Sequence, residues 1–180
     1  MNDLIILDRD GVINFEAADY IKSPEEWTPI PGSLEAIAQL NRACYTVALA
    51  TNQGGIARGL YTHKILQAIH QKMQDALQQV AAKIDAIFYC PHIDEQNCDC
   101  RKPKPGLLRQ IAQHYGCSLS GVRFIGDSWR DIQAAYAIGC QPILVLTGYG
   151  KETLRTQPEL KNQIPCFSDL AAAVSFILSA

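Results

Sequence analysis

The sequence lacks the long apolar run that a membrane helix or an export signal would need. The first apolar run covers only residues 4–7 and ends at Asp8, and no stretch approaches the ~20 apolar residues of a membrane span. A block of basic residues is also missing, and the formal net charge is −2. We therefore expect a cytoplasmic protein that neither enters a membrane nor binds nucleic acid as its main activity.

Internal repeats and low-complexity linkers are missing too, and the 180 residues suit one hydrophobic core. A chain of this length buries roughly 70% of the surface that its unfolded state exposes. Hydrophobic residues make up 48% of the chain and charged residues 19%, as in ordinary globular proteins. We expect a single domain over residues 1–180. We also expect a monomer, although the sequence leaves the oligomeric state open.

Short apolar runs alternate with longer helical patterns along the chain. The runs expected to form buried strands are residues 4–7, 46–51, 85–90, 122–127 and 142–148. The segments expected to form helices are residues 33–43, 62–82, 106–116, 130–138 and 168–178. The alternation predicts an α/β fold with a doubly wound parallel sheet, covered by helices on both faces. The polar segment 151–165 is expected to be a surface excursion.

Polar side chains follow four of the predicted strands, at or soon after the point where each strand ends. In chain order they are Asp8 and Asp10, then Thr51, then Lys102, then Asp127. Ligands of an open α/β sheet bind beyond the carboxyl ends of the strands, so these side chains should meet at one edge. An aspartate at a strand end is more often a turn or cap residue. The ordered combination is therefore what indicates a site.

This set of side chains suits phosphoryl transfer. Several carboxylates around one point repel one another unless a hard cation lies between them, and Mg²⁺ prefers such oxygen ligands. One carboxylate can attack phosphorus and form an aspartyl-phosphate, while the metal reduces its repulsion from the phosphate. A hydroxyl and an ammonium can hold the phosphoryl oxygens. A second acid can protonate the leaving alkoxide and then activate water.

Four ordered motifs of the chain resemble those of the haloacid dehalogenase-like (HAD-like) phosphatases: DRDGVIN (8–14), TNQ (51–53), Lys102 and GDSWRD (126–131). The resemblance implies that Asp8 is the nucleophile and Asp10 the general acid/base. It implies that Thr51 and Lys102 hold the phosphoryl group. It also implies that Mg²⁺ is bound by Asp8, the backbone carbonyl of Asp10 and Asp127.

Asp131, in the last of these motifs, has two interpretations. It is a further acid close to the metal, or it is a favourable acid in the first turn of a helix. The sequence leaves both open.

A cluster of soft ligands precedes the basic stretch 101–104. Cys90 and His92 are separated by five residues from Cys98 and Cys100, and four such side chains suit tetrahedral Zn²⁺. In the cytoplasm the seven cysteines, an odd number, are expected to be thiols or metal ligands rather than disulfides. Four protein ligands leave no open position. The zinc is therefore expected to be structural and to fix the backbone of the basic stretch.

The remaining cysteines and histidines are given no part in the site. Each of these cysteines is isolated in an apolar or helical context and is expected to be a small core residue: Cys44, Cys117, Cys140 and Cys166. The histidines are expected on the surface: His63, His70 and His114.

Little of the chain is left for the inserted cap domain that closes the site in larger HAD-like proteins. About twenty residues separate Gly11 from the next predicted helix, and one helix takes up much of residues 54–84. We therefore expect a capless fold with a zinc-stapled loop. Its pocket should be formed by residues 15–30, the turn 54–59 and the zinc loop.

The combination of DRDGVIN, TNQ…GIARG and CPH…CDCRKP is similar to a small zinc-containing branch of this family. That branch holds the D-glycero-D-manno-heptose-1,7-bisphosphate 7-phosphatases and the histidinol-phosphate phosphatases, and the chain resembles the heptose enzymes more. The resemblance implies hydrolysis of the C7 phosphate during nucleotide-heptose synthesis for bacterial lipopolysaccharide. The substrate contacts that it implies are Asn52, Gln53, Gly54, Arg101 and, with less direct support, Arg58.

Departures from the heptose pattern leave the substrate open. Gly54 stands where many relatives have serine, and Ser128 stands where some heptose enzymes have lysine. The short zinc loop also suits a histidinol-phosphate phosphatase. Two alternatives belong to other classes: a receiver-like signalling domain with a persistent aspartyl-phosphate, and a zinc-binding interaction module. The second would leave the acids at the strand ends unexplained.

Overall fold

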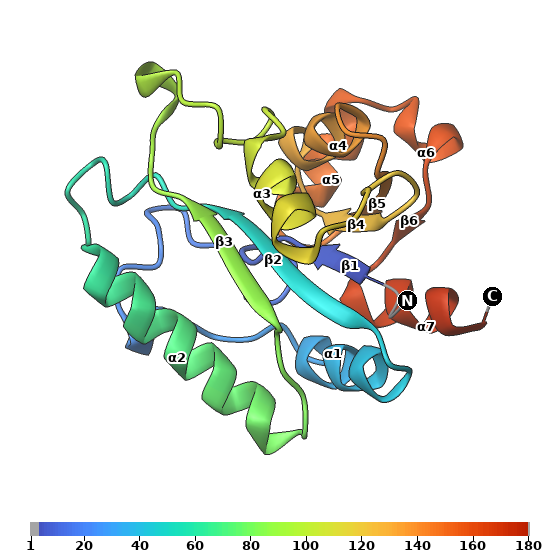
Figure 1. Ribbon diagram of the computed structural model, residues 1–180, viewed down its shortest axis with the longest axis horizontal. Coiled ribbons are helices and arrows are strands. Elements are labelled where there is room, and N and C mark those ends of the chain that lie inside the picture. Colours follow the sequence, from blue (N-terminus) through green and yellow to red (C-terminus); the bar gives the residue numbers. More distant parts are fainter. Residues whose placement is uncertain (1–3, 180) are drawn as a thin grey trace.

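The computed structural model describes residues 4–179, so residues 1–3 and Ala180 of the expected domain lie outside the described part. Its centre is a parallel sheet with strand order β3-β2-β1-β4-β5-β6 (Figure 1). The strands are β1 (Leu4–Leu7), β2 (Thr46–Asn52), β3 (Ala86–Cys90), β4 (Arg123–Gly126), β5 (Gln141–Val145) and β6 (Cys166–Phe167). The predicted doubly wound fold and its five strands are confirmed, and the short β6 is additional.

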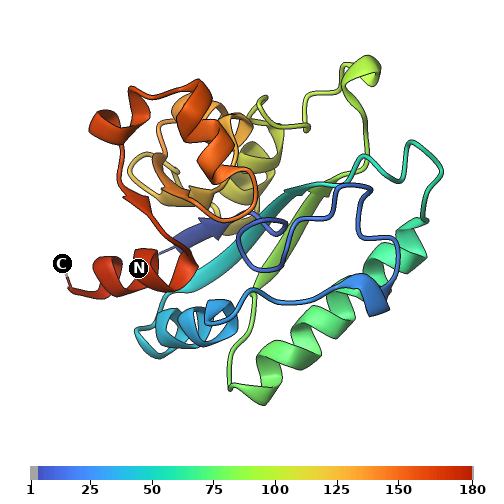
Figure 2. The same cartoon turned by 180° about the vertical axis from the view of Figure 1, so that it is seen from behind.

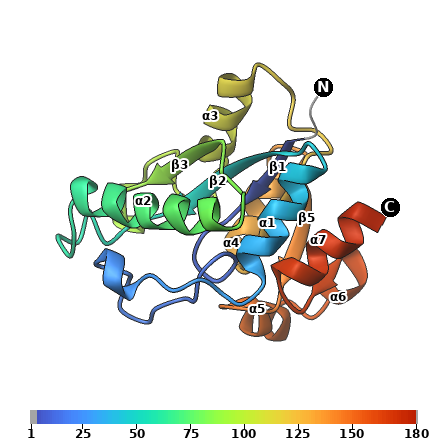
Figure 3. The same ribbon diagram turned by 90° about the horizontal axis from the view of Figure 1, so that it is seen from below.

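Helices cover both faces of this sheet. They are α1 (Ser33–Arg42), α2 (His63–Gln79), α3 (Gly106–Tyr115), α4 (Trp129–Tyr136), α5 (Gly150–Thr156), α6 (Leu160–Gln163) and α7 (Leu170–Ser179), with 3₁₀ turns at Pro24–Glu26 and Asp94–Gln96. Buried residues of α1, α2 and α7 share one core, and those of α3 and α4 share another. Figures 1 and 3 show α1 and α2 on the opposite side of the sheet from α3.

The apolar run of β1 serves both cores. Ile5 and Leu7 pack into the core that contains α1, α2 and α7, whereas Ile6 packs into the core that contains α3 and α4. All three side chains are fully buried. A central parallel strand is covered on both faces, so it shows a continuous apolar run rather than an alternating one. This explains why the strand could be predicted from four residues.

The segment 151–165 differs from its prediction as a surface excursion. It forms α5 and α6, and Thr153, Leu160 and Ile164 are buried. Leu160 and Ile164 pack with Leu144 of β5 in a small third core. Only a few apolar residues of this segment are buried, and they are spaced among charged ones. The polar composition of the segment therefore gave no indication of the two helices.

The remaining cysteines also differ in part from their predictions. Cys140 is buried, as expected, and Cys117 and Cys166 are partly buried. Cys44 is exposed, because it lies in the turn between α1 and β2 with a left-handed backbone (φ 64°). No helix within residues 4–179 is both long and apolar enough to span a membrane.

The order of strand addition reverses at β1, with β2 on one side and β4 on the other. Such a reversal opens a crevice at the carboxyl ends of the strands. The register pairs Leu7 with Ile125, and Asp8 N donates to Ile125 O at 2.9 Å, so the residues that follow β1 and β4 are adjacent. In Figure 2 the loops after β1 and β3 lie at this edge. Within the described residues no cap domain covers it, as predicted.

Candidate functional site

A cavity of about 410 Å³ lies at the carboxyl edge of the sheet. Its lining includes six residues predicted as catalytic or substrate-binding: Asp8, Asp10, Thr51, Asn52, Gln53 and Lys102. Asp127 lines it as well. Strand ends β1, β2 and β4 supply most of this set, and Lys102 reaches it from the loop after β3. The structure thus brings the predicted set together, while the role of each residue stays a prediction.

Lys102 lies between two carboxylates. Its Nζ is 2.9 Å from Asp8 Oδ1 and 2.6 Å from Asp131 Oδ1, and it donates to Ala50 O at 2.8 Å. Burial alone would lower the pKa of Lys102, but the charges of Asp131 and Asp8 outweigh burial and raise this pKa. The buried side chain therefore keeps its positive charge, which is the form that can bind a phosphoryl oxygen.

Three buried carboxylates converge beside this lysine. Asp8, Asp127 and Asp131 each place one oxygen within 4.8 Å of the oxygens of the other two. Burial and the charges of Asp131 and Asp10 raise the pKa of Asp8 to about 7 in spite of Lys102. Burial and the charges of Asp131 and Asp8 raise the pKa of Asp127. One ammonium does not balance three carboxylates. Hard oxygen ligands with excess negative charge fit Mg²⁺.

Two glycines leave room for the Asp127 carboxylate. Gly11 (φ 77°) and Gly148 (φ 52°) both have left-handed backbones, and a Cβ on either would overlap the Asp127 side chain. The backbone N–H of Tyr149 donates to Asp127 Oδ2 at 2.7 Å, and Thr153 Oγ1 donates to Asp127 O at 2.9 Å. The unpredicted helix α5 therefore helps to hold a predicted metal ligand.

The two oxygens of Asp131 have different partners, and each set of partners agrees with one of the two predicted roles: an acid in the first turn of a helix and an acid close to the metal. Its Oδ2 accepts hydrogen bonds from Ser128 N at 3.0 Å and from Ser128 Oγ at 2.6 Å, which caps the start of α4. Its Oδ1 faces Lys102 and belongs to the carboxylate cluster. The residue can therefore cap the helix and still contribute charge to the site.

Asp10 is held by a separate set of donors. Arg9 Nη2 donates to Asp10 Oδ1 at 2.8 Å, Asn14 Nδ2 donates to the same oxygen at 2.9 Å, and Gln53 Nε2 donates to Oδ2 at 2.9 Å. Burial alone would raise the pKa of Asp10, but the charge of Arg9 and these hydrogen bonds outweigh burial and lower this pKa. Gln53 Nε2 also donates to Thr51 Oγ1 at 2.9 Å. The network thus links the second acid to the hydroxyl.

Arg9, Asn14 and His70 take part in this network but were not predicted as site residues; His70 Nε2 lies 3.2 Å from Arg9 Nη1. Arg9 is 1% exposed although it is charged, and its place between two predicted site aspartates was the available signal. His70 was expected on the surface, and that prediction is wrong, because its side chain is 8% exposed. It lies on the buried stripe of α2 with Leu66 and Met73, and this helical spacing could have placed it inside.

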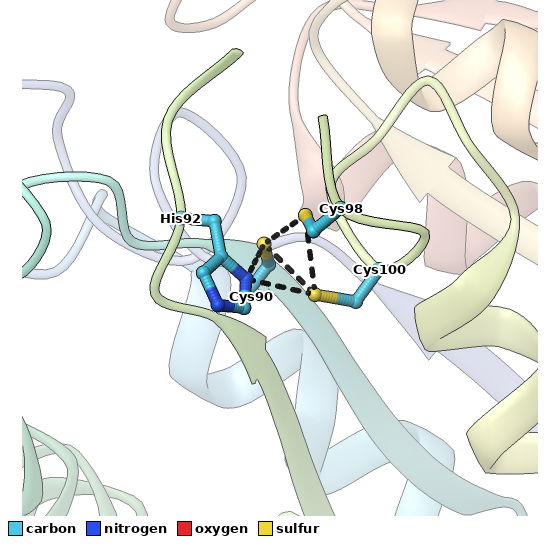
Figure 4. Close-up of side chains that lie close together, drawn as sticks. All are labelled: Cys90, His92, Cys98 and Cys100. Carbon is cyan, nitrogen blue, oxygen red and sulfur yellow. Dashed lines mark hydrogen bonds between the residues drawn. The ribbon is translucent and has the colours of Figure 1, made fainter. Parts of the chain in front are cut away.

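The predicted zinc ligands converge in Figure 4. The three sulfurs of Cys90, Cys98 and Cys100 are 3.1–3.6 Å apart, and His92 Nδ1 is 3.6 Å from Cys90 Sγ and 3.3 Å from Cys100 Sγ. A tetrahedral zinc with bonds of about 2.3 Å needs sulfurs separated by about 3.8 Å. Burial raises the pKa of Cys90, and a bound cation would favour its thiolate. The four side chains therefore fit Zn²⁺.

The zinc loop continues directly into the backbone of Lys102. Arg101 N lies 3.4 Å from Cys98 Sγ, in the geometry of an N–H donating to sulfur. Asn52 Nδ2 donates to Lys102 O at 3.0 Å, and Lys102 N donates to Asn52 Oδ1 at 3.1 Å. The amide of Asn52 thus fixes the lysine to β2. Its predicted contact with the substrate stays a prediction.

Three predicted substrate contacts lie outside the lining of the cavity: Gly54, Arg58 and Arg101. Arg101 Nε donates to Asp94 Oδ1 at 2.6 Å, and Arg58 Nε donates to Tyr20 OH at 3.1 Å. The turn 54–59 adds nothing to the described lining, contrary to expectation. Residues near the starts of α4 and α5 line it instead, with Arg130 among them.

Known proteins resemble this chain over almost its whole length. The family described as HAD-hydrolase-like matches residues 99–173. The D-glycero-beta-D-manno-heptose-1,7-bisphosphate 7-phosphatase of Pseudomonas aeruginosa is 53% identical over 175 residues, which cover 97% of each chain. The crystal structure of D,D-heptose 1,7-bisphosphate phosphatase from Bordetella bronchiseptica, complexed with magnesium and phosphate, superposes with a TM-score of 0.94. It is 51% identical and covers 98% of both chains.

Proposed function

The chain belongs to the HAD-like phosphatases, in the branch of the heptose-1,7-bisphosphate 7-phosphatases, and on this premise we propose its reaction. It hydrolyses the C7 phosphate ester of D-glycero-D-manno-heptose 1,7-bisphosphate through an aspartyl-phosphate on Asp8. The observation that carries this proposal is the meeting of Asp8, Asp127 and Lys102 at one edge of the sheet. It supplies a nucleophile, a cation site and a fixed positive charge for the phosphoryl group.

In the first step a carboxylate oxygen of Asp8 attacks the phosphorus of the C7 phosphate. The bond between phosphorus and the C7 oxygen breaks, and the leaving alkoxide takes a proton from Asp10. Lys102 holds a phosphoryl oxygen as charge redistributes. Thr51 Oγ1 accepts a hydrogen bond from Gln53, so its own O–H is left to donate to a second phosphoryl oxygen.

In the second step water attacks the phosphorus of the aspartyl-phosphate. Asp10, now a carboxylate, takes a proton from this water, and inorganic phosphate leaves with Asp8 restored. The lowered pKa of Asp10 in the free protein favours this base form. A phosphoryl group with two negative charges raises the pKa of a neighbouring carboxyl, which favours the acid form in the first step.

We propose that Asp8, Asp127 and the backbone carbonyl of Asp10 hold Mg²⁺, with Asp131 close enough to contribute. When bound, the ion reduces the repulsion between the carboxylates and the incoming phosphate. We propose that Zn²⁺ at the Cys90 cluster is structural and fixes the loop that carries Lys102. Thiol ligands of this kind stay reduced in the cytoplasm, where we place the enzyme.

The substrate that we propose is the β anomer, because the name of the relative from Pseudomonas aeruginosa specifies it. The heptose relatives also favour a sugar bisphosphate over histidinol phosphate, the alternative that the sequence left open. The anomeric phosphate remains bound to the sugar throughout the reaction and needs its own cation. Arg130 lines the cavity, and its side chain is 46% exposed. Its Nη2 donates to Asp94 Oδ2 at 3.0 Å, but this ion pair is exposed and weak enough to open when the guanidinium binds such a group.

The test is phosphate release from purified β and α heptose bisphosphates and from histidinol phosphate, with Mg²⁺ and with a chelator. We expect the highest kcat/KM on the β heptose bisphosphate and loss of activity in the chelator. A higher kcat/KM on histidinol phosphate would contradict the assigned substrate. Full activity of Asp8→Asn would contradict the mechanism.

A further inference from the structure

Arg9 is a buried cation whose guanidinium donates to the side chain of the proposed general acid/base. Its Nε donates to Asp10 Oδ1 at 3.0 Å, and its Nη2 donates to both Asp10 oxygens, at 2.8 Å and 3.0 Å. Nη2 also lies 3.2 Å from Gln53 Oε1, which accepts a further bond from Tyr61 OH at 2.6 Å. The fork of the guanidinium therefore grips the Asp10 carboxylate, while Nη1 extends toward α2.

His70 of α2 meets this free end of the guanidinium. His70 Nε2 lies 3.2 Å from Arg9 Nη1. Because a guanidinium can only donate, Nε2 must be the acceptor, which requires a neutral imidazole with its proton on Nδ1. Burial and the charge of Arg9 lower the pKa of His70 to about 3, so the ring is neutral at physiological pH. The Tyr89 ring lies next to the imidazole in an edge-type arrangement, with the ring centroids 6.2 Å apart.

We infer that His70 is a positioning residue for the general acid/base: it accepts a hydrogen bond from Arg9 and so holds the guanidinium against Asp10. The inference rests on the proposed function, because it requires Asp10 to transfer protons. A buried N–H without an acceptor costs free energy, so Arg9 would turn toward another partner if His70 lost its lone pair. Asp10 would then lose the support that fixes its carboxylate, although His70 itself touches neither substrate nor metal.

A comparison of substrates with different leaving groups distinguishes this positioning role of His70 from a merely structural one. A sugar alkoxide leaves poorly without a proton, whereas p-nitrophenolate leaves readily without one, and kcat/KM reports the steps up to this departure. A misplaced Asp10 should therefore lower kcat/KM more for the heptose bisphosphate than for p-nitrophenyl phosphate. General damage to the site, or loss of the metal, should lower both together.

The test compares His70→Leu with His70→Gln in the full chain with Mg²⁺ and Zn²⁺ bound. Leucine removes the acceptor, and glutamine restores one at a similar distance along the side chain. We expect His70→Leu to lower kcat/KM about tenfold or more for the heptose bisphosphate but less than about threefold for p-nitrophenyl phosphate. His70→Gln should recover most of the difference. Parallel losses on both substrates, or no loss on either, would overturn the inference.

Arg9→Lys is the second variant, in case His70→Leu does not fold. Lysine keeps the charge but loses the fork that binds both oxygens of Asp10. The same selective loss on the heptose bisphosphate is expected, and an equal loss on both substrates again contradicts the inference. Failure of the proposed function would be visible separately, as a wild-type enzyme that hydrolyses another alkyl phosphate better. That ester would then replace the heptose in the comparison.

Discussion

The ammonium of Lys102 lies 2.9 Å from the carboxylate of Asp8, in a pair with side-chain exposures of only 2% and 12%. Asp8 stands at the end of β1, whereas Lys102 is delivered by the zinc loop and tied to β2 through Asn52. The pair therefore connects the proposed nucleophile with the segment that zinc is proposed to fix. The charge of Lys102, the zinc site proposed to support its loop and the Mg²⁺ proposed to bind beside it can each be changed separately.

Replacing Lys102 tests the fixed charge. We expect Lys102→Met to lower kcat/KM by about 10²-fold or more, because one preorganised donor to the phosphoryl group is lost. Loss of one partner from a buried ion pair should also lower the free energy of unfolding by roughly 3–5 kcal/mol. Lys104→Met is the control, because the Lys104 ammonium donates to the exposed Asn97 and Lys104 does not line the cavity. A folded Lys102→Met enzyme with activity within threefold of wild type would be inconsistent with this role.

Removing zinc tests the support of the loop. We expect Cys98→Ser to lower the zinc content, the Tm and kcat together, because the loop that carries Lys102 loses its anchor. Added Zn²⁺, but not added Mg²⁺, should restore protein stripped by a strong chelator. Cys44→Ser is the control, since Cys44 is exposed and lies in the turn between α1 and β2. Wild-type kcat in a protein proven free of zinc would rule out this support.

The pKa of Asp8 predicts how stability depends on pH in the absence of metal. This pKa is raised by burial from 3.8 to about 7. Between these values the folded protein keeps a proton that the unfolded chain has lost, so the free energy of unfolding falls as the pH rises through this range. The metal-free protein should thus have a lower Tm at about pH 8 than near pH 5. Mg²⁺, which binds the ionised site, should raise the Tm more at the higher pH.

Two variants show which residues cause this pH dependence of stability. Asp8→Asn should remove a large part of the pH dependence and raise the Tm of the metal-free protein at about pH 8. Burial also raises the pKa of Glu16 to about 7, so Glu16→Gln measures the share of that residue. Calorimetry over this pH range is the measurement. A Tm that rises with pH in the metal-free wild type would contradict the sign of the prediction.

Arg130 tests the binding of the second phosphate. We expect Arg130→Gln to raise KM for the heptose bisphosphate about tenfold, with kcat nearly unchanged, because it contacts a group that does not react. KM for p-nitrophenyl phosphate, which has no second phosphate, should stay within about twofold. Arg155→Gln is the control, since Arg155 is exposed, pairs with Glu152 on α5 and does not line the cavity. Equal rises in KM for both substrates would contradict a specific contact.

The parts of the site that follow central strands could be predicted from the sequence. Asp8 and Asp127 each come directly after a strand that is buried on both faces, and such strands show as continuous apolar runs. The cluster of four proposed zinc ligands could also be predicted, because these residues lie close together in the sequence. In both cases a short stretch of sequence is enough to predict the position of the residues: an apolar run in the first case and the close spacing of cysteine and histidine in the second.

The parts that depend on contacts between distant elements could not be predicted. The helical spacing of α2 could have placed His70 inside, but its contact with Arg9 depends on how α2 packs against the core that also contains Ile5 and Leu7 of β1. The bonds of Arg101 to Asp94 and to the carbonyl of His92 likewise became visible only in the structure, and its contact with the substrate stays a prediction. Helices α5 and α6 were missed because their few buried residues are scattered among polar ones.

The most direct test of the central claim is to trap the phosphoryl group on the enzyme. Asp10→Asn should slow attack by water, and a rapid acid quench during turnover of p-nitrophenyl phosphate, which needs no acid, should preserve the covalent species. We predict that peptide sequencing by mass spectrometry places one phosphoryl group on Asp8, and that Asp8→Asn shows none. A phosphoryl group on another residue, or none at all while this variant turns over, would contradict nucleophilic attack by Asp8.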